Sequence, residues 1–202
     1  MRRLSLPKMF IEIEVTDENG RLLERRREES HSWVGNFVKA LFGTLYTHLR
    51  SQVTSVKLVD GTEKAFPNLN IQTEPYMKLK AAEGDDTHGV VVGSGDTPVS
   101  IDDYNLASKI PNGTGAGQLS YGPVTMDAPM KTDSGYLFRV VRTFTNNSGG
   151  DITVKEVGLI AYHKHVDGAV YFLIARDVLA SPVTVPNGST LTVRYIVQYS
   201  LS

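Results

Sequence analysis

The chain has 202 residues, 41% of them hydrophobic and 21% charged, and its 21 basic and 22 acidic side chains leave a net charge of −1. The absence of cysteine excludes disulfide scaffolds, thiolate catalysis and Cys-ligated zinc or iron–sulfur sites. A near-neutral charge gives no electrostatic reason to expect nucleic acid as a partner, and the apolar runs are too short to span a bilayer. Because no long apolar segment follows Arg2 and Arg3, no signal peptide is expected and synthesis is predicted in the cytoplasm.

The N-terminal region predicts a β-hairpin. Apolar and acidic residues alternate over residues 10–16, as in a strand with one buried face. Asn19-Gly20 tolerates the positive φ of a tight reversal, so the return strand is placed at residues 21–28. Four arginines interleave with three glutamates over residues 21–29, which favours cross-strand ion pairs over contacts to phosphate.

One amphipathic helix of about 15–18 residues is predicted next, because apolar residues recur there at three- and four-residue steps. Capping hydroxyls at Ser30 and Ser32 precede it. Its apolar stripe is wide and aromatic and consists of Trp33, Val34, Phe37, Val38, Leu41, Phe42, Leu45, Tyr46 and Leu49. The pattern leaves open whether this stripe packs on the protein's own core or contacts another subunit.

The rest of the chain predicts strands separated by Gly, Pro and Asn turns. The expected strands lie at residues 54–59, 76–81, 88–92, 118–126, 135–146, 152–163, 169–178 and 190–200. A short helix is expected at 101–108 and an irregular connection at 62–74. The predicted fold class is mainly β, an antiparallel β-sandwich or jelly-roll-like domain at 53–202. The hairpin and the amphipathic helix form a preceding packing or assembly element at 1–52.

No arrangement of residues predicts catalysis, a metal or a cofactor. The glycines of residues 89–95 lack the Gly-Lys-Ser/Thr ending of a phosphate loop, so a strand running into a glycine turn is favoured. His163 and His165 lie two residues apart, but Asp167 is the only further zinc ligand nearby, so a polar hairpin end is favoured. Residues 81–108 contain six acidic side chains and no Lys or Arg, yet not at the spacing of an EF-hand. With no Gly-x-Ser-x-Gly motif either, a non-enzymatic protein without cofactor is expected.

The second half of the chain resembles a known class of proteins in four successive segments. The first runs from Gly93-Ser-Gly-Asp-Thr-Pro98 to Ile110, and the others span residues 142–159, 173–179 and 183–195. In this order the four segments are similar to structural proteins of the β-sandwich type that occur in tailed-bacteriophage particles. The resemblance covers the chain from Gly89 onward and is less specific in the N-terminal hairpin and helix.

This resemblance implies a structural virion protein that associates with itself and binds other particle proteins. Its place would be in the head (capsid or decoration), the head–tail joint, or the tail or baseplate, with neither nucleic acid nor membrane as a direct partner. The alternative is a β-sandwich module that binds glycans or the host surface, for which Tyr121, Tyr136, Tyr162 and Tyr171 are candidates. The side chains proposed for subunit contacts are Trp33, Phe37, Leu41 and Phe42, with Arg25, Arg26, Asp85 and Asp86 setting the register.

Overall fold

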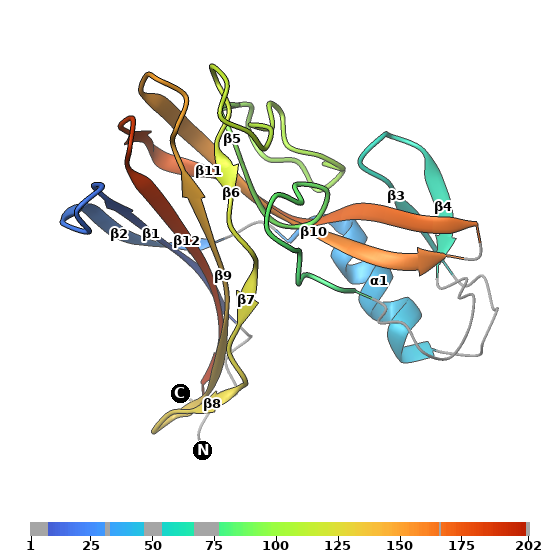
Figure 1. The fold of residues 1–202 in the computed structure, drawn as a ribbon. Coiled ribbons are helices and arrows are strands. Elements are labelled where there is room, and N and C mark those ends of the chain that lie inside the picture. The colour runs from blue at the N-terminus through green and yellow to red at the C-terminus, as the bar shows by residue number, and fades with distance from the viewer. Residues whose placement is uncertain (1–7, 31–32, 47–53, 67–76, 166, 201–202) are drawn as a thin grey trace.

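The computed structural model describes residues 8–30, 33–46, 54–66, 77–165 and 167–200 (Figure 1). These residues form one helix and three antiparallel sheets, and side chains from all of them contribute to one hydrophobic core. The predicted fold class, a mainly β protein of sandwich type with a single amphipathic helix, is confirmed.

The larger sheet contains both ends of the described chain. Its strands follow the order β2-β1-β12-β9-β6, and two further short strands, β7 and β8, also pair with β9. Their bounds are β1 Lys8–Thr16, β2 Leu22–Ser30, β6 Ser120–Tyr121, β7 Thr125–Met126, β8 Met130–Lys131, β9 Gly135–Thr145 and β12 Thr190–Ser200. β1 pairs with β12 along its whole length, from Lys8 opposite Gln198 to Thr16 opposite Thr190. The N-terminal hairpin is therefore part of the same sheet as β9 and β12. The expected boundary at residue 52, between an N-terminal element and a β-sandwich domain, does not separate the strands of this sheet.

The second sheet has the order β11-β10-β5 and contains the two longest strands. Their bounds are β5 Gly89–Gly93, β10 Ile152–His165 and β11 Gly168–Val185. Figure 1 shows β10 and β11 extending past the larger sheet, to the region where the helix α1 (Gly35–Tyr46) and the hairpin of β3 (Thr54–Lys57) and β4 (Glu63–Phe66) lie. Phe66 of that hairpin meets Phe172 of β11 edge to face, with ring centroids 5.6 Å apart.

The helix begins later than its apolar pattern predicts. Trp33 forms a β-bridge with Ala175, and the Val34 N–H donates to the carbonyl of Ile174, so both residues belong to the edge of the second sheet. α1 starts only at Gly35, and the last predicted turn, at Leu49, lies outside the described residues.

Several other segments differ from the prediction. Strand β4 forms within the connection expected to be irregular at 62–74, and the strand expected at 118–126 is divided into β6 and β7. The helix expected at 101–108 is wrong: this segment is an irregular loop. Of the strand expected at 76–81, the described residues form only a bridge between Lys78 and Tyr162. β11 does not end at residue 178; its ladder with β10 is interrupted after Val178 and resumes at Val183. Pro182, which has no N–H to donate, lies in that interruption on an edge strand.

Candidate interaction surface

The helix α1 packs on the protein through its small side chains. Asn36, Ala40 and Gly43 are buried, and the helix lies against β3, β4 and β11. Asn36 pairs with the backbone of Lys57 in β3: its Nδ2 donates to the carbonyl at 2.8 Å, and its Oδ1 accepts from the N–H at 2.9 Å. This amide pair fixes the distance between helix and strand, and only small residues fit on the same side.

The large apolar side chains of α1 face the opposite way. Val38 is 61% exposed, Leu41 39%, Phe42 50% and Leu45 77%. At about 100° per residue these four positions lie about 100–160° around the helix axis from Ala40 and share one side of the helix. We call them the helix face. An amphipathic helix of a globular domain normally turns its large apolar side chains toward the core, so this exposed side is the candidate interaction surface.

Two of the four aromatic and aliphatic residues predicted for contacts do not belong to the helix face. Trp33 and Phe37 stack with ring centroids 3.9 Å apart, are partly buried, and pack against the core. Leu41 and Phe42 do lie on the helix face. Val38 and Leu45 belong to the predicted apolar stripe but are not among the residues proposed for subunit contacts. The small residues Ala40 and Gly43 on the other side of the helix are the sequence feature that indicates which side packs on the protein.

A loop from the second half of the chain extends the helix face at its N-terminal end. The Gly35 N–H donates to the carbonyl of Ile101 at 2.8 Å, and the Ile101 side chain lies beside Gly35 and is 63% exposed. Helical geometry places Gly35 on the flank of Val38 and Phe42. Ile101 therefore continues the apolar surface beyond the helix.

The fully buried carboxylate of Glu156 holds this loop in place. Its Oε1 accepts from the N–H groups of Gly95 at 3.1 Å and Ser108 at 2.7 Å, and its Oε2 accepts from Ala107 at 3.0 Å. A Cβ atom at Gly93 or Gly95 would lie 2.5 Å from Oε1, so both glycines make room for the carboxylate. These amides bind a carboxylate of the chain itself, which agrees with a glycine turn rather than a phosphate loop.

Arg176 neutralises that carboxylate. Its Nε donates to Glu156 Oε2 and its Nη1 to Asp103 Oδ2, both at 2.8 Å, and its Nη2 donates to the carbonyl of Thr97 at 2.9 Å. Burial lowers the pKa of Arg176, but the hydrogen bonds to Asp103 and Glu156 outweigh it and keep the pKa above the ordinary value. The loop is thus tied to β10 and β11 by a buried ion-pair network.

The segments that carry the phage resemblance meet in this network. Asp103 comes from the first segment, Glu156 from the second and Arg176 from the third. Leu106 of the first segment also packs where Gly158 of the second has no side chain, since a Cβ there would lie 2.6 Å from Leu106 Cδ1. The resembling residues therefore build the interior that positions the loop, rather than the exposed surface.

A second buried arginine organises the acidic loop next to it. Arg142 is almost fully buried, and its guanidinium donates only to backbone carbonyls among the contacts of the described residues. The acceptors, at 2.5–3.1 Å, are Ala82, Asp85, His88, Val90 and Gly122. No sequence pattern marked this residue, because its partners lie 20–60 positions away along the chain.

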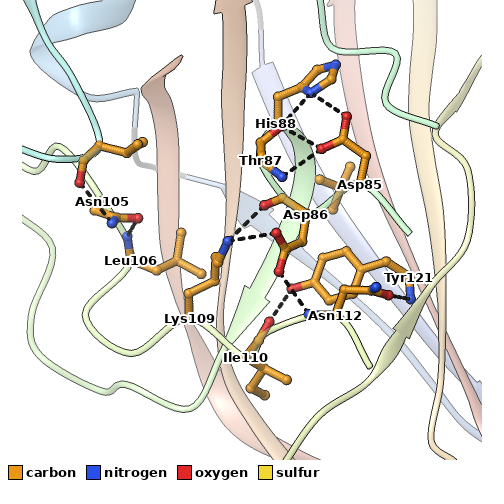
Figure 2. A network of polar contacts seen from close by, with 12 residues as sticks. Asp85, Asp86, Thr87, His88, Asn105, Leu106, Lys109, Ile110, Asn112 and Tyr121 are labelled. Atoms are coloured by element: carbon orange, nitrogen blue, oxygen red, sulfur yellow. Dashed lines mark hydrogen bonds and ion pairs between the residues drawn. The ribbon is translucent and has the colours of Figure 1, made fainter. Parts of the chain in front are cut away.

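Asp85 and Asp86 are occupied by contacts within this loop (Figure 2). Asp85 accepts from the Thr87 N–H at 2.9 Å and approaches His88 Nδ1 at 3.2 Å, while Asp86 pairs with Lys109 at 3.3 Å. Burial lowers the pKa of His88, although the neighbouring Asp85 opposes this shift. Both carboxylates therefore shape the loop, and their role in setting a subunit register stays a prediction.

Among the arginines of β2, Arg25 forms the predicted cross-strand ion pairs. Arg25 lies 3.2 Å from Glu12 and 3.9 Å from Glu14 on the outer face of the larger sheet. Arg26 points inward instead, toward the carbonyl of Ser181 on β11. Figure 1 shows β2 and α1 on opposite sides of the molecule, so the structure does not bring Arg25 and Arg26 together with the helix face.

The described residues contain no cluster of His, Asp and Glu that could hold a metal ion, and no helix among them is long and apolar enough to cross a membrane. His163 and His165 are both buried in β10, and His163 packs against Phe66 with ring centroids 4.7 Å apart. A scan against protein-family models and searches of curated proteins and solved structures find no match to the chain.

Proposed function

We propose that this chain is a non-enzymatic structural protein of a tailed-bacteriophage particle, which associates with itself and binds other particle proteins. The observation that carries the proposal is the helix face, where four large apolar side chains point away from the core while small ones pack against it. Exposed apolar surface on the order of 400 Å² is typical of interaction sites on otherwise soluble domains.

The buried network supports the same proposal. Glu156 and Arg176 fix the loop that carries Ile101, so the apolar surface is presented by rigid parts of the fold rather than by a free segment. A preorganised surface loses little conformational entropy when it binds. Three of the four segments that resemble phage structural proteins supply this framework.

Sedimentation velocity at about 200 μM protein, combined with negative-stain imaging of any larger assemblies, tests self-association. The wild-type chain is expected to form oligomers, and the variant Leu41→Asp/Leu45→Asp to be monomeric, because two carboxylates would have to be buried at the contact. The matched control is Leu22→Asp/Leu23→Asp, which makes the same change at two exposed leucines of β2, away from the helix. A monomeric wild type, or equal loss of oligomers in the control, would contradict the proposal.

Phe37→Asp is a poor test of this surface, because Phe37 stacks on Trp33 and packs against the core.

The location of the chain in a phage particle is tested separately, by peptide mass spectrometry of virions purified from the cells that carry this gene. The chain is expected among the particle proteins in stoichiometric amounts, and its absence from them would contradict the phage assignment.

A glycan-binding role is the second candidate, favoured by one hollow on the larger sheet. Tyr136 is exposed and lies directly opposite Tyr199 across β9 and β12, beside a hollow of about 200 Å³ that Thr132 and Ser134 also line. Aromatic rings beside hydroxyl groups suit sugar rings. Of the other candidate tyrosines, Tyr121 is buried. Binding on a glycan array that is lost in Tyr136→Ala would support this role, and an array without binding would refute it.

A further inference from the structure

We propose that the partner of the helix face is a second copy of this chain, docked antiparallel through α1 about a twofold axis. This inference rests on the proposed self-association and names its contact. The interface would be isologous, meaning that each copy contributes the same residues.

The spacing of the exposed side chains makes the helix face complementary to itself. Val38, Leu41, Phe42 and Leu45 follow an i, i+3, i+4, i+7 pattern, which reads the same in both directions. When two such helices pack antiparallel, Val38 faces the second copy's Leu45, and Leu41 faces the second copy's Phe42. Every exposed apolar side chain of the helix then meets another apolar side chain.

The charges on the helix permit this pairing. Lys39 is the only charged residue of α1. In the antiparallel pair the two lysines are offset by about 7.5 Å along the axis at 1.5 Å per residue, between axes about 8–10 Å apart. Their separation therefore exceeds the Debye length of about 8 Å at physiological salt, and repulsion between them is weak. Each lysine also lies near the C-terminal turn of the opposite helix, where the helix dipole favours a positive charge.

The far side of the molecule does not offer an alternative partner surface for the helix face. The outer face of the larger sheet has a hollow of about 470 Å³ lined mainly by charged side chains. They are Glu12, Glu14, Arg25, Arg27, Asp127, Arg139 and Arg194. Covering these ions with valine and leucine would desolvate them without new partners, so a head-to-tail contact between helix face and sheet face is unfavourable.

The area of the helix face sets the strength of the contact. A contact made by four side chains and Ile101 of each copy is smaller than the about 1,200–2,000 Å² of standard stable interfaces. The isolated dimer is therefore expected to have a dissociation constant of about 1–100 μM and to depend on protein concentration.

Cysteine cross-linking tests the antiparallel geometry, and the cysteine-free chain gives it a clean background. Val38→Cys and Leu45→Cys are prepared separately and oxidised mildly, alone and as an equimolar mixture. The antiparallel pair predicts a covalent dimer mainly in the mixture, because residue 38 of one copy faces residue 45 of the other. Parallel helices would instead cross-link each variant with itself. The control Leu22→Cys, on the exposed end of β2, is expected to give no dimer in either setting.

Sedimentation velocity of the wild-type chain, from about 5 to 200 μM, separates the two proposals. If wild type associates but the mixture cross-links no better than the single variants, the antiparallel contact is overturned while self-association stands. If wild type remains monomeric over the whole range, both the contact and the proposed self-association are refuted. Dimers that survive in Leu41→Asp/Leu45→Asp would also overturn the helix contact.

Discussion

Four donors surround the two oxygens of the Glu156 side chain, which has no solvent exposure. Oε1 accepts from the N–H groups of Gly95 and Ser108, and Oε2 accepts from Ala107 and from Arg176. A buried ion pair is tolerated when its remaining hydrogen-bonding capacity is satisfied in this way. These contacts also explain why residues 101–108 form no helix. The N–H groups of Ala107 and Ser108 donate to Glu156 instead of to carbonyls within the segment.

We expect Glu156→Gln to be strongly destabilising although it keeps the size of the side chain. An amide has only one acceptor oxygen, so its NH₂ group would face two donors, and Arg176 would lose its closest anion. A loss of about 3–5 kcal/mol in the free energy of unfolding is expected from breaking a buried pair. Urea unfolding measures it, and hydrogen exchange at Gly95, Ala107 and Ser108 should accelerate.

Asp96→Asn is the matched control for this prediction. Asp96 pairs with Lys155 at 2.8 Å, but its side chain is mostly exposed, so its loss should destabilise the protein far less than Glu156→Gln. Equal effects of the two substitutions would show that Glu156 is not the buried anchor of the loop.

His88 makes stability depend on pH. Burial lowers its pKa below the ordinary value of about 6.5, against the opposing attraction of Asp85. The unfolded chain then binds more protons than the folded chain between these two pKa values. Stability is full above about pH 6.5 and falls as the pH drops through the folded pKa. In His88→Gln, the loss of unfolding free energy between about pH 7.5 and 5.5 should be smaller than in wild type.

Asp85→Asn should change the same pH profile in the opposite direction. Removing the carboxylate 3.2 Å from His88 Nδ1 takes away the attraction that raises the pKa of His88. The acid sensitivity above pH 5 should then increase. Urea unfolding at a series of pH values measures both variants, and identical profiles for wild type and His88→Gln would contradict the assignment to His88.

At the scale of elements, α1 has an unusual division between its two sides. Its packing contacts come from the small residues Asn36, Ala40 and Gly43 and from Phe37, whereas the side chains of the helix face are exposed. Substitutions should therefore have the reverse of their usual effects on monomer stability. On the buried side of α1 a larger side chain would be overpacked. On the exposed side a smaller side chain would break few contacts, so the stability of the monomer would change little.

We expect Ala40→Leu to destabilise the monomer by about 1–3 kcal/mol through overpacking against β3 and β11. Leu45→Ala, which removes the most exposed side chain of the helix, should change the stability by less than about 0.5 kcal/mol. Thermal unfolding at low protein concentration compares the two. A larger loss from Leu45→Ala than from Ala40→Leu would mean that the helix faces the other way.

The sequence predicts those elements whose periodicity depends on local burial. Alternation in residues 10–16 and 190–200 locates β1 and β12 closely, because one face of each strand is buried. The stripe of α1 was equally visible, but periodicity does not say which side of a helix meets the core. Its start was misplaced because Trp33 and Val34 pair with β11, which is a contact across more than 130 residues.

The candidate surface was only partly predictable for the same reason. Leu41 and Phe42 were found from the stripe, whereas Ile101 reaches the helix only through the loop that Glu156 and Arg176 hold. No local pattern shows that a glutamate and an arginine distant in sequence will satisfy the backbone of residues 94–108. The prediction of a short helix there was wrong because the acceptor of these backbone N–H groups, Glu156, lies outside the segment.

At the scale of the whole molecule, many of the opposite charges that sum to the near-zero net charge pair with one another within the chain. In the acidic segment, Asp86 pairs with Lys109, Asp96 with Lys155 and Asp103 with Arg176. In β2, Arg25 pairs with the glutamates of β1. The acidic loop and the arginine hairpin are therefore not two free patches of opposite charge, and apolar contact is left as the main source of affinity.

This balance predicts that self-association depends little on salt. Between about 50 and 500 mM NaCl, screening strongly weakens attraction between exposed charges, whereas apolar burial is unaffected or slightly strengthened. The dissociation constant of the wild-type dimer, measured by sedimentation equilibrium, should change less than about threefold over this range. Weakening by more than about tenfold would instead mean that Arg25, Asp85 and similar groups pair between subunits rather than within one. In that case Arg25→Ala should remove the salt dependence, whereas Leu45→Ala should leave it in place.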